Sequence, residues 1–271
     1  MPSIISVIKS VLKKILPPRL KAWIVRMRGE NLKSIDLSVI NKIRDLSKKT
    51  LENAEFLEKE LLPELGFNNE QLHQFPPELY EYCGKGVLHW QYPNQFSRYL
   101  VLLSQLKPNS YLEIGVRHGG TFIITLEYLK EFTPIKKAIA IDLAYPPGLS
   151  KYKTLNPAVH FYQMNSQLPE FKKLVEAEKQ IDLVFIDGNH EEWACMNDFM
   201  NLKEVANIIA VHDIVSDECP GVKKLWAFIK SEFKSNYFFY EFNDQYASVI
   251  QNNGPSFFGI GVAVKKDFHQ K

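Results

Sequence analysis

The segment Tyr111-Leu-Glu-Ile-Gly-Val-Arg-His-Gly-Gly-Thr-Phe122 joins a short apolar run to a turn with three glycines and to the start of a helical stretch. Glycine lets the backbone adopt turns that other residues resist, and it lets a ligand approach the chain closely. In open α/β sheets such a turn follows the carboxyl end of a strand, where ligands bind. We therefore predict a strand, a ligand-binding turn and a helix; the alternative is a tight turn that holds no ligand.

The spacing of charges and glycines in this turn limits the choice of ligand. A dinucleotide fingerprint G-x-G-x-x-G that starts at Gly115 requires glycine where Arg117 stands, which disfavours an NAD-dependent oxidoreductase. The pattern present is acid-x-Gly-x-x-x-Gly, formed by Glu113, Gly115 and Gly119. A carboxylate here repels a pyrophosphate but attracts a cation, and S-adenosylmethionine (SAM) carries an ammonium and a sulfonium. SAM is therefore the expected cofactor.

Around this turn, short apolar runs alternate with helical stretches from about residue 94 onward. Helical stretches separate the first five runs, which predicts βαβ units and a parallel sheet covered on both faces. The last two runs are joined by a loop at 243–255 with no helical pattern, which predicts an antiparallel hairpin at one edge. The expected fold is a doubly wound, Rossmann-like α/β sheet. The runs are Tyr111–Gly115, Ala138–Asp142, Val159–Tyr162, Ile181–Asp187, Ile208–Asp213, Tyr237–Phe242 and Phe257–Val264.

Polar residues at the ends of the second and third runs predict an adenosine site. Asp142 ends the second run, where an acid can accept hydrogen bonds from both ribose hydroxyls. NAD proteins share this feature, so it does not name the cofactor. The third run ends at Asn165 and Ser166, whose side chains we expect beside the adenine. Met164 offers a flexible apolar face there, or is an ordinary core methionine.

The fourth and fifth runs predict the reacting groups. Asp187 ends the fourth run and His190 follows three residues later, while the fifth run ends in His212 and Asp213. Asp187, His212 and Asp213 form an oxygen-rich set with one imidazole, which favours Mg²⁺ or Mn²⁺ over zinc, since zinc prefers thiolates or more histidines. His190 is the expected general base for a hydroxyl nucleophile. Its alternative role is to cap a helix or to orient a ligand.

Four motifs in this order resemble those of class I SAM-dependent methyltransferases, in particular the branch related to metal-dependent O-methyltransferases that act on catechols and on macrolide or aminocoumarin sugars. The resemblance covers roughly residues 94–265. The motifs are Glu113-Ile-Gly-Val-Arg-His-Gly-Gly-Thr121, Phe185-Ile-Asp-Gly-Asn-His190, His212-Asp-Ile214 and Pro220-Gly-Val-Lys-Lys-Leu-Trp226.

This resemblance implies O-methylation of a hydroxyl. It implies SAM contacts at Glu113, Gly115 and Asp142 and near Asn165–Ser166. It also assigns metal binding to Asp187 and the base to His190. Relatives carry Asp-Asp or Asp-Asn where this chain has His212-Asp213. The departure leaves two alternatives: a weaker metal site, or a second acid/base group at His212.

Composition sets further limits. Of 33 Lys and Arg residues, eight lie within residues 1–33 against one acid, Glu30, so the remaining chain holds 25 basic and 30 acidic residues. A basic end on an acidic body indicates a local contact of that end and not a nucleic-acid-binding surface. Cys83, Cys195 and Cys219 are widely separated and form no CxxC pair, so we interpret all three as small buried apolar residues in a reducing, cytoplasmic compartment.

The N-terminus predicts a basic amphipathic helix at residues 4–16, ended by Pro17-Pro18. It is not a typical signal peptide, because lysines interrupt the apolar core. Residues 1–28 either make a peripheral contact with the inner face of the membrane or pack on the protein body or a second subunit of an oligomer. Apolar residues at helical spacing also predict helix over residues 37–63. We place a helical extension at residues 1–75 and the SAM-binding domain at 76–271, with the boundary at Pro76-Pro77.

The leader also resembles those of enzymes of bacterial surface-polysaccharide pathways. That resemblance favours a small-molecule or glycan hydroxyl as acceptor. The alternative function is a degenerate methyltransferase fold that tethers a partner or a membrane through its basic N-terminus. Retention of Glu113, Asp142, Asp187 and Asp213 together disfavours that alternative.

Overall fold

The computed structural model describes residues 32–251 and 254–268. The predicted basic helix at residues 4–16 and the membrane or partner contact through residues 1–28 lie outside the described residues. In the part of the chain that is described, no helix has the length and apolar character required to cross a bilayer.

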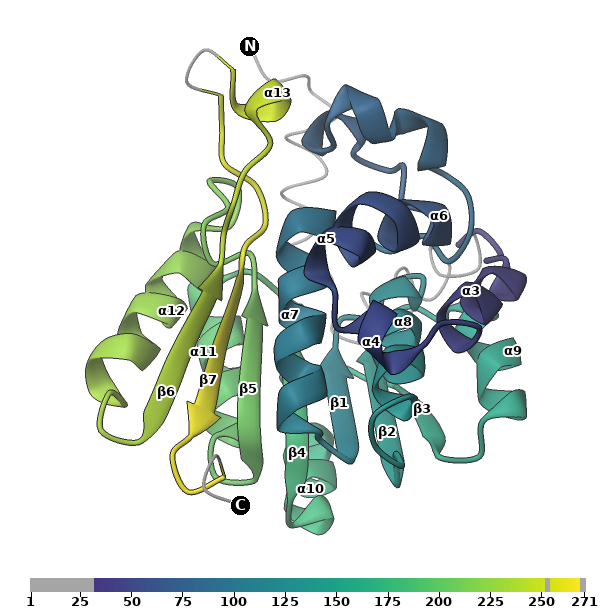
Figure 1. Cartoon of the computed structure of the whole chain (residues 1–271). Coiled ribbons are helices and arrows are strands. Elements are labelled where there is room, and N and C mark those ends of the chain that lie inside the picture. Colours follow the sequence, from purple (N-terminus) through teal and green to yellow (C-terminus); the bar gives the residue numbers. More distant parts are fainter. Residues whose placement is uncertain (1–31, 252–253, 269–271) are drawn as a thin grey trace, which may run out of the picture.

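One seven-stranded sheet forms the centre of the molecule, in the order β3-β2-β1-β4-β5-β7-β6. The first five strands pair with one another in parallel, and β7 runs antiparallel to both β5 and β6. The predicted doubly wound α/β sheet with a hairpin at one edge is confirmed (Figure 1). The strands are β1 Ser110–Ile114, β2 Lys137–Asp142, β3 Val159–Gln163, β4 Ile181–Ile186, β5 Ala206–His212, β6 Tyr237–Phe242 and β7 Ile260–Lys265.

Helices cover both faces of the sheet, because successive strand residues point to opposite sides. Tyr111 of β1 packs in the apolar cluster of α7, α8 and α9, and its neighbour Leu112 packs in the cluster of α10, α11 and α12. Four of these helices begin with proline, which has no N–H to leave unpaired in the first turn. The helices are α7 Pro93–Leu106, α8 Gly120–Lys130, α9 Pro147–Leu155, α10 Pro169–Glu178, α11 Glu192–Leu202 and α12 Pro220–Glu232.

Short helical pieces precede α7, where the sequence predicted helix over 37–63. Two side chains restart the helix: Ser47 accepts a hydrogen bond from the N–H of Thr50, and Asn53 accepts from the N–H groups of Glu55 and Phe56. The pieces pack into the same apolar cluster as α7 and α8. They are η1 Leu37–Ile40, α3 Asn41–Arg44, α4 Lys48–Leu51, α5 Ala54–Phe56, η2 Leu57–Leu61, α6 Leu62–Leu65, η3 Leu72–Gln74 and η4 Pro77–Tyr82.

The connection between the last two strands differs in one detail from its prediction. The loop at 243–255 was expected to hold no helix, but it contains the single turn α13 Ala247–Ile250. Gln245 closes the base of this loop, since its side chain both donates to the carbonyl of Phe257 and accepts from the N–H of the same residue. The hairpin strands still pair as expected.

Candidate active site

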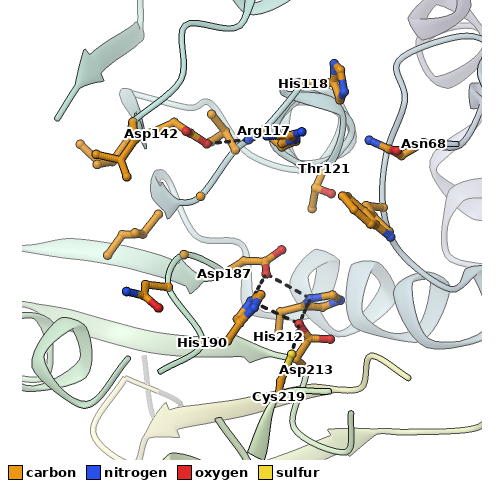
Figure 2. A pocket seen from close by; sticks show the side chains of 18 of the residues that line it. Asn68, Arg117, His118, Thr121, Asp142, Asp187, His190, His212, Asp213 and Cys219 are labelled. Atoms are coloured by element: carbon orange, nitrogen blue, oxygen red, sulfur yellow. Dashed lines mark hydrogen bonds and ion pairs between the residues drawn. The ribbon is translucent and has the colours of Figure 1, made fainter. Parts of the chain in front are cut away.

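A cavity of about 680 Å³ opens at the carboxyl ends of β1, β2, β4 and β5. This volume lies within the usual range for small-molecule sites. The glycine turn after β1 and the ends of the neighbouring strands line it, and segments before α7 line the opposite wall (Figure 2). The strand-end residues Asp142, Asp187, His212 and Asp213, which the sequence predicted to lie together, all line this cavity.

Gly115 is the residue that lets two strand ends meet at the floor of the cavity. Its φ is +88°, and a Cβ atom there would lie 1.9 Å from the backbone oxygen of Asp187. The N–H of Asp187 in turn donates to the carbonyl of Ile114 at 2.9 Å. Gly119, with φ +91°, is the N-cap residue just before α8 and is not among the described residues that line the cavity. The glycines thus shape the turn, and Gly115 alone of the predicted pair borders the cavity.

Glu113 does not lie on the cavity wall among the described residues. Its side chain is only 1% exposed and accepts a hydrogen bond from the Tyr111 hydroxyl. Burial raises the pKa of Glu113 well above its usual value, which opposes a permanent charge there. The Glu113 carboxylate was expected to attract a cationic ligand, but in this structure it does not face the cavity in which such a ligand would bind.

Asp142 occupies the position expected for a ribose-binding acid. One carboxylate oxygen accepts from the N–H of Arg117 at 2.7 Å, and the other accepts from the N–H of Ala144 at 2.7 Å. Burial raises the pKa of Asp142, and these two N–H donors oppose the rise. Each oxygen accepts one such bond, so each retains capacity for a ligand hydroxyl. The side chain lines the cavity.

The loop after β3 lines the next part of the cavity with Asn165 and Ser166. Gln167 fixes this loop to α11, because its side-chain amide donates to the Ser166 hydroxyl at 3.0 Å and to Asp198 at 2.8 Å. Asn165 accepts from the N–H of Gln167 at 2.9 Å. The two predicted adenine-side residues are thus held in place by the helix that follows β4.

At the other end of the cavity, the two acids and two histidines predicted from the sequence lie together (Figure 2). His190 Nε2 lies 3.4 Å from Asp187 Oδ1 and 3.2 Å from Asp213 Oδ2. His212 Nδ1 lies 3.2 Å from Asp187 Oδ1 and 3.6 Å from Asp213 Oδ2. The predicted metal set of Asp187, His212 and Asp213 forms one compact group of donor atoms.

The acids and histidines of this cluster shift one another's pKa values. Burial lowers the pKa of His190, but the hydrogen bonds and charges of Asp187, Cys219 and Asp213 outweigh it and raise the pKa to about 11. The same opposition raises the pKa of His212 to about 10. Burial raises the pKa of Asp213, while the histidines lower it to about 2. The neighbouring acids therefore favour the imidazolium form of both histidines, and a cation that compensated the acids would lower both pKa values.

Two further groups at the site were not predicted. Cys219, treated as a plain apolar residue, places its sulfur 3.4 Å from Asp213 Oδ2 and joins His190 and Asp213 in a second group of donor atoms. Glu70 reaches the glycine turn, where it accepts from Arg117 at 2.5 Å and lies 2.9 Å from His118 Nε2. Burial raises the pKa of Glu70, but Arg117 and His118 outweigh it and lower the pKa. Neither residue has a sequence signal of its own, because loop packing brings both to the site.

Comparison with known proteins gives one match that bears on this site. Residues 112–214 match a family model described as a methyltransferase domain. The matched segment includes the glycine turn, Asp142, Asp187 and the His212-Asp213 pair. A search of curated proteins found no match.

Solved structures with a similar fold include two O-methyltransferases. One is the O-methyltransferase from Bacillus cereus in complex with SAH, 14% identical, with a TM-score of 0.47 over 89% of this chain and 97% of that chain. The other is TomG from Streptomyces achromogenes in complex with SAM, described as involved in tomaymycin synthesis, 12% identical, with a TM-score of 0.48 over 92% of this chain and 99% of that chain.

Proposed function

We propose that this protein is a SAM-dependent O-methyltransferase acting on a hydroxyl of a sugar, glycan or related small acceptor. The observation that carries the proposal is one cavity with Asp142 in one part of its wall and the Asp187–His190 pair in another. All three residues lie within the segment that matches the methyltransferase-domain model. Methyl transfer requires the acceptor oxygen to be aligned with the methyl group of SAM. One cavity that contains both a nucleoside-binding acid and a proton acceptor can hold the two reactants in that geometry.

Different residues along the cavity would bind SAM and accept the proton. SAM, when bound, supplies a methyl group on a sulfonium to a nucleophilic oxygen. Gly115 leaves the backbone open where a side chain would collide with the end of β4. Asp142 would hold the ribose hydroxyls, and Asn165 and Ser166, which line the same cavity, would flank the adenine. His190 would accept the proton of the acceptor hydroxyl, and Asp187, whose Oδ1 lies 3.4 Å from His190 Nε2, would stabilise the imidazolium that forms.

The donor chemistry of Asp187, His212 and Asp213 fits a divalent cation. Such an ion would compensate the two carboxylates, lower the pKa of a bound hydroxyl and orient it. For His190 the consequence is electrostatic: with those negative charges compensated, its pKa falls from about 11 toward the range where an imidazole accepts a proton. This links the proposed base to the proposed metal set.

Calorimetry with the full chain tests the cofactor. We expect SAM to bind and NAD to show no comparable binding, because Arg117 occupies the position of the second fingerprint glycine. The Asp142→Ala variant should weaken SAM binding, since the two ribose hydroxyls lose their acceptor. Binding of NAD without binding of SAM would overturn the assignment.

Turnover with methyl-labelled SAM and a panel of sugars tests the base. His190→Ala should lower kcat by about 10²- to 10⁴-fold, the usual contribution of a general base, while SAM affinity stays near that of the unchanged protein. His160→Ala is the matched control, because His160 lies on β3 and is not among the described residues lining the cavity. Equal turnover of the two variants would reject His190 as the base. A tethering function that survives His190→Ala would favour the binding-protein alternative.

Exhaustive chelation tests the metal separately. We expect turnover to fall on chelation and to recover with Mg²⁺ or Mn²⁺, because a bound cation would lower the pKa of His190. Full activity after chelation would remove the catalytic metal from the proposal and leave SAM binding untouched.

A further inference from the structure

The second group of donor atoms beside Asp213 differs in chemistry from the first. His190 and Cys219 lie on either side of Asp213 Oδ2, at 3.2 Å for the imidazole nitrogen and 3.4 Å for the sulfur (Figure 2). Nitrogen, oxygen and sulfur donors of these three residues all lie within 4.8 Å of one another. Asp213 and Cys219 are buried, at 7% and 8% exposure, whereas His190 is partly exposed toward the cavity.

These separations match the edges of a tetrahedral metal shell. Zinc bonds of about 2.0–2.2 Å to nitrogen and oxygen and about 2.3 Å to sulfur place neighbouring ligands roughly 3.4 Å apart for nitrogen–oxygen and about 3.6 Å apart for sulfur–oxygen. The two distances at Asp213 lie close to these values. Three protein ligands with a fourth side toward a cavity is also the usual form of a zinc site that keeps one open position.

The donors also select the class of metal. Mg²⁺ prefers a shell of oxygen ligands and water, whereas a thiolate and an imidazole favour a borderline or soft ion such as Zn²⁺. The group Asp187, His212 and Asp213 contains no sulfur, and the group His190, Asp213 and Cys219 does. The two groups share Asp213, so an ion in one changes the charge available to the other.

We propose that His190, Asp213 and Cys219 form a distinct site for a thiophilic divalent cation of the Zn²⁺ class, and that its occupation withdraws His190 from proton transfer. The imidazole lone pair at Nε2 cannot both coordinate an ion and accept a proton from the acceptor hydroxyl. Coordination also releases the thiol proton of Cys219 to solvent. The inhibitory consequence rests on the proposed function, but the metal site does not.

Cobalt absorption tests the site directly on the full-length protein. Co²⁺ alone, titrated into metal-free protein, should produce the near-ultraviolet sulfur-to-cobalt charge-transfer band that only a thiolate ligand gives. The Cys219→Ser variant should lack this band and bind Zn²⁺ at least about tenfold more weakly, since even an outer partner of a ligand is worth that much. Serine is a favoured residue at the start of a helix, where Cys219 stands before α12, so the variant should fold.

Cys195→Ser is the matched control. Cys195 is 2% exposed and its sulfur donates to the carbonyl of Glu192, so the exchange alters a buried thiol on α11 that belongs to neither donor group. The band should persist in this variant. Absence of the band in the unchanged protein, or an equal band in Cys219→Ser, would overturn the site. SAM calorimetry on the same samples reports the proposed function separately, so either idea can fail while the other stands.

Discussion

Gly115 shows how one missing side chain determines the floor of the cavity. A Cβ atom there would lie 1.9 Å from the backbone oxygen of Asp187, and the residue has a φ of +88°. Gly115→Ala therefore incurs both left-handed backbone strain and a collision with a backbone atom that cannot move alone. We expect a large loss of stability and displacement of Asp187, measured as a lowered Tm and weakened SAM binding.

Gly119→Ala separates these two effects. Gly119 also has a left-handed φ, +91°, but its added Cβ atom would meet the side chain of Leu149 at 3.3 Å. Its substitution should cost only the strain of about 1–2 kcal/mol and a small shift of Leu149. Equal loss of stability in the two variants would show that the approach of Asp187 to Gly115 does not matter.

Trp193 is the residue at the cavity best suited to contact an acceptor ring. It follows the His190 loop at the start of α11, lines the cavity and is 62% exposed, so its indole ring can contact a ligand there. Trp193→Ala should raise the acceptor KM by about tenfold, or about 1.4 kcal/mol, with SAM affinity unchanged. Met200→Ala on the same helix, 46% exposed and not on the cavity, is the control. A raised SAM Kd with an unchanged acceptor KM would contradict this role.

Individual site residues could be predicted from the sequence when they lie at the end of a strand. Asp142, Asp187 and the His212-Asp213 pair end buried strands, and parallel strands present their carboxyl ends at one edge, so their convergence follows from order along the chain. Cys219 and Glu70 come from loops, whose paths depend on packing that no local pattern encodes. Glu113 was predicted to contact SAM, and its place in β1 directs the side chain to the hydroxyl of the buried Tyr111.

At the scale of elements, α11 carries a buried acid that supports the adenine side of the cavity. Asp198 is fully buried and accepts from Gln167 at 2.8 Å, and burial raises its pKa to about 7 while Ser166 and Gln167 oppose the rise. An acid with a raised folded-state pKa binds more protons folded than unfolded between pH 4 and 7. The free energy of unfolding therefore falls as pH rises through this window and levels off above it.

Asp198→Asn should remove this contribution to the pH dependence. The amide oxygen can still accept from Gln167, and no charge forms at high pH. We expect the variant to gain stability relative to the unchanged protein as pH rises from 4 to 7, by at most about 4 kcal/mol at about 1.4 kcal/mol per pKa unit. Urea unfolding at several pH values measures the difference. A difference that stays constant from pH 4 to 8 would contradict the raised pKa.

Elements were predictable where hydrophobic patterning is strong and uninterrupted. Every predicted apolar run corresponds to a strand, since buried central strands are continuously apolar. The stretch over 37–63 was correctly assigned as helical, but the pattern does not show that Ser47 and Asn53 restart the helix, because their effect is a side-chain hydrogen bond to the backbone. The short α13 was not predicted, because a helix of one turn is too short to show a hydrophobic period.

For the molecule as a whole, the open question is whether the segment before Pro76 is an appendage or part of one core. The division at residues 75 and 76 remains a prediction. Seven apolar side chains of the N-terminal pieces are at most 5% exposed and share a cluster with α7 and α8. They are Ile40, Ile43, Leu51, Leu57, Leu61, Leu62 and Leu65. Arg44 adds an ion pair to Glu127 of α8 at 2.6 Å.

The isolated fragment 76–271 should therefore not fold cooperatively. Each buried leucine or isoleucine contributes about 1.5–3 kcal/mol by leaving water, so loss of the segment removes roughly 10–20 kcal/mol, against a total stability of about 5–15 kcal/mol for a typical domain. Circular dichroism and thermal unfolding of the fragment measure this. A cooperative transition with retained SAM binding would instead support an independent domain at 76–271.

Point variants in the full chain test the same claim without deletion. Leu62 is fully buried, so Leu62→Ala should lower the free energy of unfolding by about 2–5 kcal/mol through lost burial and a cavity. Lys59 lies in the same helical segment with 61% of its side chain exposed and pairs only with Glu55 one turn away. Lys59→Ala should change stability by less than about 0.5 kcal/mol, since exposed pairs contribute little. If the segment were an appendage, Leu62→Ala would melt it alone and leave the main unfolding transition and SAM binding unchanged. A single shifted transition shows instead that the N-terminal helices and the sheet unfold as one unit.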